Sequence, residues 1–197
     1  MMATRRELQA RSTRADIMAS ARRLFAERGF AATSVADIAR DAGVAVPTVY
    51  KSAGTKQAIL HALVDAVDEE AGVLEGRAAI RAAEGPEAIL HAAVTITRHM
   101  QERCGDVISG LASAAAAHDD ARAALAEGER RHREGMRTVA RRLKGSGALR
   151  VPVNDATATI VLLTSRHAYA ELTQELGLSF DRAQAWIEER LAALLLD

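Results

Sequence analysis

The sequence predicts an all-α protein, and three observations support this class. Alanine, the residue with the highest helix propensity, occurs 43 times in 197 residues, whereas proline occurs three times. Aromatic residues, which favour strands, make up only 3% of the chain. Apolar residues also recur at helical spacing along most of the chain. We therefore expect about nine helices and no strand.

The first helix is predicted over residues 13–28, after a basic arm at residues 1–12. Ile17, Ala21, Leu24 and Phe25 recur at i, i+4, i+7 and i+8 and so share one face. Gly29 is a typical helix stop. The arm itself is basic and has no such pattern, so we expect it to be mobile.

Two short helices follow, and their spacing is typical of a helix-turn-helix. The first of the pair begins at Thr33 or Ser34 and ends at Gly43, with Asp37 completing a capping-box pattern; the second spans residues 46–52. Ala39 is small enough to let two steeply crossing helices approach, and Gly43 can adopt a positive φ in the turn. The outer face of the second helix is then free to enter the major groove of DNA.

Longer helices make up the rest of the chain. One begins at residues 54–56, and five more are predicted between breaks at Gly, Pro, Asn or Asp: 86–103, 105–118, 119–144, 152–176 and 180–196. Residues 13–60 are therefore the predicted DNA-binding domain. Residues 61–197 form a second helical domain.

Composition and charge restrict the class further. The one cysteine, Cys104, cannot form an intrachain disulfide. No apolar segment follows the basic N-terminus, and the longest uncharged runs reach about ten residues, whereas a membrane span needs roughly 20. We therefore expect a cytoplasmic protein with no membrane partner.

The net charge is zero, but the charge is unevenly distributed. Residues 1–60 contain ten Lys and Arg against five Asp and Glu, whereas residues 61–197 contain 16 against 21. A basic N-terminal part favours contact with a polyanion, although chance variation in a charged surface is the alternative.

The segment from Gly29 to Leu60 carries a longer set of residues at characteristic spacing. They are Gly29-Phe30, Thr33-Ser34-Val35, Asp37-Ile38-Ala39, Ala42-Gly43-Val44, Pro47-Thr48-Val49-Tyr50, Lys56 and Ile59-Leu60. By these residues the segment resembles the N-terminal domain of the TetR family of bacterial transcriptional repressors. The chain length and the helical body are also similar to this family. The resemblance implies a repressor that binds a palindromic operator as a homodimer and is released by a small-molecule effector.

The resemblance implies contacts with double-stranded DNA for eight residues. Residues 46–52 become the recognition helix, and its first residues, Val46, Pro47 and Thr48, contact base edges. Lys51 lies on the same helix. The phosphate backbone is contacted by Thr33, Ser34, Tyr50 and Lys56. The arm can reach a minor groove with Arg5, Arg6, Arg11 and Arg14, unless it is a solvated terminus.

Two residues depart from the family pattern. Ala53 stands where a phenylalanine is usual, so part of the small core must be missing or filled from elsewhere. Ala45 stands where a serine often caps the recognition helix, at a cost of about 1 kcal/mol that Pro47 can partly offset. Val46 and Pro47 can contact a thymine methyl but cannot read guanine, so we expect backbone contacts to carry much of the affinity.

A helix-turn-helix monomer covers one half-site, so we expect a homodimer with recognition helices roughly 34–36 Å apart, or a multiple of that distance. In the TetR family the last two helices of each subunit form a four-helix bundle. The residues expected in this interface are Ala158, Val161, Leu162, Ser165, Ala168, Trp186, Ile187, Leu191 and Leu194. The alternative is that these faces pack within their own monomer.

The middle helices would then hold a pocket for a small or hydrophobic effector. The candidate residues are Ile96, His99, Met100, Ile108, Leu111, His132, Met136 and Tyr169, each of which has ordinary core or surface packing as its alternative. The effector would favour a conformer whose recognition helices no longer match the half-site spacing.

Two other classes of protein compete with this interpretation. A di-iron enzyme in a helical bundle needs two Glu-x-x-His pairs, and the chain has one, Glu129 to His132. We therefore expect no catalytic residue, metal or cofactor. A helical ligand carrier that never meets DNA would show no salt-dependent DNA binding. Activation instead of repression is open within the DNA-binding class.

Overall fold

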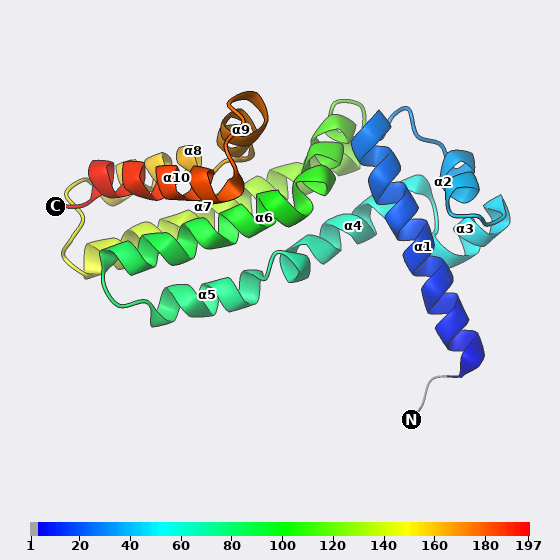
Figure 1. The fold of residues 1–197 in the computed structure, drawn as a ribbon, viewed down its shortest axis with the longest axis horizontal. Helices are drawn as coiled ribbons and strands as arrows, with labels where there is room; N and C mark the ends of the chain where they lie inside the picture. The colour runs from blue at the N-terminus through cyan, green and yellow to red at the C-terminus, as the bar shows by residue number, and fades with distance from the viewer. Residues whose placement is uncertain (1–3) are drawn as a thin grey trace. The chain divides into compact units, whose positions relative to one another are not determined.

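The fold is all-α, as the sequence predicts. The computed structural model describes residues 4–197. Within that range there is no strand, and the one β-type pairing is an isolated bridge between Leu149 and Leu196. The helices are α1 (Arg5–Arg28), α2 (Val35–Asp41), α3 (Val46–Ala53), α4 (Lys56–Glu70), α5 (Val73–Ala82), α6 (Pro86–Ala115), α7 (Asp119–Gly145), α8 (Val153–Leu163), α9 (Arg166–Ala170), a π-helical segment (Glu171–Glu175) and α10 (Phe180–Leu195) (Figure 1).

The chain divides into two compact units. The first contains the residues up to Val67 together with Asp106–Ala126, and the second contains Asp68–Gly105 and Glu127–Asp197. The helix-turn-helix predicted from the sequence lies in the first unit, and all of α8 to α10 lies in the second.

In the first unit, α1 packs against both α2 and α3, and α2 packs against α3 (Figure 1). The inward side chains of this three-helix cluster include Ile17, Phe30, Ile38 and Val49, all fully buried. The turn between α2 and α3 contains Gly43 at φ 65°, a left-handed conformation that a residue with a Cβ adopts at a cost. The predicted helix-turn-helix is therefore confirmed.

The start of α2 is fixed by a reciprocal cap. The Ser34 hydroxyl accepts a hydrogen bond from the Asp37 backbone N–H at 3.1 Å, and the Asp37 carboxylate accepts one from the Ser34 backbone N–H at 3.0 Å. The predicted capping box is confirmed, with Ser34 and not Thr33 as the cap.

Helix α1 begins at Arg5, eight residues before the predicted start. The predicted helix start at residue 13 is wrong, because residues 5–12 of the predicted arm are helical; residues 1–3 lie outside the described residues. The physical reason is a second capping box. The Thr4 side chain caps the Glu7 backbone N–H, and the Glu7 carboxylate accepts from the Thr4 backbone N–H at 2.7 Å.

Three predicted boundaries in the later helices also change. The predicted helices 86–103 and 105–118 are one helix, α6, because a glycine inside a helix costs only about 0.5–1 kcal/mol and Gly105 does not end it. The predicted helix 152–176 breaks after Leu163, where Ser165 starts α9 by accepting from the Ala168 N–H at 3.1 Å. Helix α5 was not delimited from the sequence. Within residues 4–197 the structure has ten α-helices and one π-helical segment, against about nine predicted helices.

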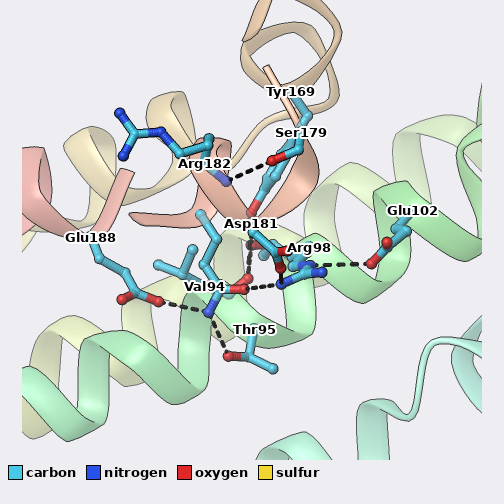
Figure 2. Close-up of polar contacts among 11 residues, drawn as sticks. Val94, Thr95, Arg98, Glu102, Tyr169, Ser179, Asp181, Arg182 and Glu188 are labelled. Carbon is cyan, nitrogen blue, oxygen red and sulfur yellow. Dashed lines mark hydrogen bonds and ion pairs between the residues drawn. The ribbon is translucent and has the colours of Figure 1, made fainter. Parts of the chain in front are cut away.

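In the second unit, α10 is joined to α6 by a polar network (Figure 2). The buried Gln184 amide accepts from Arg98 at 3.1 Å and donates to Thr95 at 3.1 Å and to Glu188 at 2.7 Å. Arg98 also forms an ion pair with Asp181 at 2.6 Å. The buried amide thus has partners for both of its polar atoms, which fixes α10 against α6 in one register.

Candidate nucleic-acid interface

The outward face of α3 is the centre of the candidate interface. Val46, Pro47, Tyr50 and Lys51 are exposed, and 52% of the tyrosine surface is accessible. Thr48 is half-buried. The opposite side of α3 holds Val49 and Ala53 against the neighbouring helices, so the exposed residues project away from the unit.

The ends of α3 show how the two departures from the family pattern are accommodated. Ala45 at the N-cap makes no side-chain hydrogen bond, as predicted, although its carbonyl accepts from the Thr48 N–H at 2.8 Å. Pro47 lies in the first turn, where a missing N–H leaves no helical bond unmade. Ala53 is buried at the other end, so a methyl group occupies the position of the usual ring.

Lys56 is tied to the loop that leads into α2. Its ammonium donates to the carbonyl oxygens of Phe30 at 2.8 Å and Thr33 at 2.9 Å, and lies 4.3 Å from the centroid of the Phe30 ring. Partial burial lowers the pKa of Lys56. An ammonium has three N–H donors, so one N–H is not used by these two bonds.

The two predicted hydroxyl contacts differ in exposure. Thr33 is only 1% exposed, and its single O–H is shared between the carbonyls of Gly29 at 2.9 Å and Leu24 at 3.2 Å. Its side chain is therefore used inside the unit and does not reach the surface. Ser34 is exposed at the start of α2.

The arginines of the predicted arm lie on α1 and fall into two groups. Arg5, Arg6 and Arg11 are exposed on its first turns. Arg14 is also exposed, but its guanidinium donates to the carbonyl of Ser52, near the C-terminal end of α3. The structure therefore connects Arg14 with the recognition helix, a contact that no sequence motif indicated.

A second arginine of α1 holds α2 in a similar way. The Arg23 guanidinium forms an ion pair with Asp41, the last residue of α2. Hydrogen bonds from Arg23 and Ser20 lower the pKa of Asp41, and the same pair raises the pKa of Arg23. Sequence reasoning missed this contact because the two residues are 18 positions apart on different helices.

The residues expected to bind an effector do not all lie in one unit. Ile108 and Leu111 belong to the first unit, and the remaining six belong to the second: Ile96, His99, Met100, His132, Met136 and Tyr169. Ile96, Leu111, Met136 and Tyr169 are buried, and the others are half-buried.

Two of these residues bring polar atoms into the interior of the second unit. The Tyr169 hydroxyl lies 3.4 Å from both the Thr97 hydroxyl and the Val94 carbonyl (Figure 2), and burial raises its pKa to about 12. The His132 ring nitrogen Nε2 lies 3.2 Å from the Thr164 hydroxyl. Burial lowers the pKa of His132, which favours the neutral ring.

The residues expected at a dimer interface divide into exposed and interior sets. Ala158, Leu162, Trp186 and Leu194 are exposed on α8 and α10, and Val161, Ser165 and Ala168 are half-buried. Ile187 and Leu191 are fully buried within the second unit. Their assignment to an intersubunit surface is wrong, because they lie on the face of α10 that forms the interior of the subunit.

Two further findings concern the part of the chain that the structure describes. Within residues 4–197, no three His, Cys, Asp or Glu side chains gather as a metal ion would require. None of the helices in this range combines the length and the apolar character that a membrane crossing demands.

Comparison with known proteins identifies the family. A family model for bacterial regulatory proteins of the tetR family matches residues 17–63. The HTH-type transcriptional regulator TtgR of Pseudomonas putida is 40% identical over 68 residues, which are 34% of this chain and 32% of that protein. The match thus spans about a third of the length of this curated relative.

Similarity to solved structures extends over most of the chain. A transcriptional regulator of the TetR/AcrR family from Thermobifida fusca is 30% identical, with 90% of this chain and 95% of that one covered and a TM-score of 0.65. SmeT, solved in complex with triclosan, is 18% identical over 94% of this chain and 92% of its own, with a TM-score of 0.71. The matched regulator from T. fusca covers both units, and the chain belongs to the TetR family of bacterial regulatory proteins.

Proposed function

We propose that this protein is a ligand-responsive transcriptional repressor that binds a palindromic operator as a homodimer. The observation that carries the proposal is the exposed face of α3, held outward by its buried opposite side. An exposed second helix of a helix-turn-helix is the element that enters a major groove.

The proposed DNA contacts follow from exposure. Val46, Pro47 and Thr48 meet base edges at the start of α3, where apolar side chains can contact thymine methyl groups. Phosphates are contacted by Ser34, Tyr50, Lys51 and the remaining N–H of Lys56. The exposed arginines of α1, Arg5, Arg6 and Arg11, add positive charge near the duplex. Thr33 is left out because its hydroxyl is bonded internally.

The proposed dimer uses the exposed apolar residues of α8 and α10. Leu162 is 69% exposed and Trp186 is 40% exposed, and Ala158 and Leu194 are exposed on the same two helices. Large exposed apolar side chains on adjacent helices are typical of an interaction surface. A second copy of the chain would cover them and would bring two recognition helices to one operator.

The proposed effector site lies among the helices of the second unit. The triclosan complex of SmeT supports a small-molecule ligand in this fold. Ile96, Met136 and Tyr169 supply buried surface there, and His99, Met100 and His132 are partly accessible. Effector and operator would then oppose each other through the same coupling free energy.

Selection of duplexes from a random library tests the proposal directly. The wild-type protein should enrich a palindrome whose half-sites lie about one helical turn apart or a multiple of it. Affinity for that duplex should fall steeply with salt. If no duplex sequence is enriched, or if binding does not change with salt, DNA recognition is refuted and a ligand carrier is favoured.

A charge-matched pair of variants locates the contact on α3. Lys51→Gln should reduce the slope of log affinity against log salt by about 0.9 for each DNA-bound subunit, because one phosphate contact is lost. Arg77→Gln removes one positive charge from an exposed position on α5 and should leave the slope unchanged. Equal slopes for the two variants would place the interface elsewhere.

A further inference from the structure

Arginine side chains of α1 reach the C-terminal ends of both helices of the helix-turn-helix. Arg14 donates to the carbonyl of Ser52 near the end of α3, and Arg23 pairs with Asp41 at the end of α2. The last carbonyls of a helix have no partner within it and carry the negative end of its dipole. A guanidinium is a suitable partner for such a group because it is always charged and donates several hydrogen bonds.

The contact of Arg14 has particular weight for α3. This helix has only eight residues, lacks a side-chain cap at Ala45 and has a methyl group at the inward-facing Ala53. Its orientation therefore depends on few side chains, among which Val49 is fully buried. Arg14 supplies a polar connection at the C-terminal end of α3, where the inward-facing side chain, Ala53, is small.

We propose that Arg14 is a positioning residue that orients the recognition helix through the Ser52 carbonyl and makes no phosphate contact itself. This inference rests on the proposed function, since it assigns a role within the same DNA-binding surface. It removes Arg14 from the arginines expected to contact DNA. Arg11 stays in that group, because it is exposed one turn earlier on α1.

Arg14→Gln and Arg11→Gln form a matched pair, because each removes one positive charge from α1. Binding is measured over a range of salt concentrations, against the duplex selected by the wild-type protein and against a random-sequence duplex of equal length. Stoichiometric titration gives the DNA-binding fraction of each preparation. Arg14→Gln should lower affinity for the selected duplex about two- to fivefold per recognition helix, the range for a cation at a helix end.

Two features of the binding data separate positioning from direct contact. A misoriented α3 loses base contacts, so Arg14→Gln should reduce the ratio of selected to random affinity while the salt slope stays at the wild-type value. A slope reduced by about 0.9, with both duplexes weakened equally, would identify Arg14 as a phosphate contact and overturn the inference. A lower melting temperature with unchanged DNA binding would also overturn it.

Hydrogen–deuterium exchange tests the same inference without DNA. Arg14→Gln should accelerate exchange of the amides from Tyr50 to Gly54, whereas Arg11→Gln should leave them at the wild-type rate. Equal exchange in both variants would refute the positioning role whether or not a duplex is bound. Failure of the wild-type protein to select any duplex, with the exchange result as expected, would refute only the proposed function.

Discussion

Replacing Gly76 with alanine tests how closely α5 packs on α6. A Cβ added to Gly76 would lie 2.1 Å from Cγ1 and 2.5 Å from Cδ1 of Ile96, both far inside van der Waals contact. Within a helix, alanine in place of glycine gains about 0.5–1 kcal/mol. Overpacking of a core costs about 1–3 kcal/mol, so we expect Gly76→Ala to be net destabilising by about 0–2.5 kcal/mol.

Gly135 provides the matched control, because it also lies inside a helix of the second unit but has no atom within 4 Å of an added Cβ. Gly135→Ala should therefore stabilise the protein by about 0.5–1 kcal/mol. Urea unfolding followed by circular dichroism at one protein concentration measures both free energies, since dimerisation would make stability concentration-dependent.

The Ile96→Ala background identifies the clash itself. That substitution removes Cγ1 and Cδ1 and leaves Cβ, which is 3.4 Å from the added atom. In this background Gly76→Ala should become as favourable as Gly135→Ala, which gives a coupling free energy of about 0.5–3 kcal/mol. If Gly76→Ala stabilises the wild-type protein as much as Gly135→Ala does, the close approach of α5 and α6 is refuted.

Three further predictions concern stability and assembly. Lys56→Met should destabilise the protein by about 1–2 kcal/mol in urea unfolding, because two carbonyls lose a charged donor at a partly exposed site. Hydrogen bonds from Ser34 lower the pKa of Asp37 from 3.8 to about 2, so the ionised form stabilises the folded state above the unfolded pKa. The difference in unfolding free energy between wild type and Asp37→Asn should accordingly be constant above about pH 5 and shrink as pH falls through 4 towards 2. A difference independent of pH would show that the ionised Asp37 carboxylate does not stabilise the start of α2. Leu162→Glu should yield a folded monomer in sedimentation velocity, whereas Leu74→Glu, at a residue 75% exposed on α5, should leave the oligomeric state as in wild type.

The helix-turn-helix could be predicted from the sequence because its requirements are local. Ser34 with Asp37 specifies the start of α2, and Gly43 specifies the turn through its positive φ. The start of α1 follows the same local rule, since Thr4 and Glu7 form a capping box of the same kind. An apolar stripe does not mark that boundary, because the first turns of α1 are mostly polar and are exposed on all sides, Leu8 included.

Contacts between side chains and distant carbonyls could not be predicted in this way. Lys56 donates to carbonyls 26 and 23 residues away, and Arg14 to one 38 residues away. Every residue has a carbonyl, so the acceptor leaves no signature in the sequence, and the donor looks like any surface cation. Both residues therefore resembled DNA contacts from the sequence, although each has a structural partner in the folded unit.

The assignment of α10 shows a second limit, because apolar residues of this helix occupy both buried and exposed positions. The sequence places Trp186, Ile187, Leu191 and Leu194 in one predicted interface set, because their spacing does not indicate which of them face the interior. Ile187 and Leu191 are buried within the subunit, whereas Trp186 and Leu194 remain exposed. A buried Gln184 on the inward face, satisfied by Arg98 and Thr95 of α6, fixes that choice, because turning the helix would leave its amide without partners. In the proposed dimer, the residues of α10 that meet a second copy, Trp186 and Leu194, are therefore those that remain exposed once Gln184 is bonded to α6.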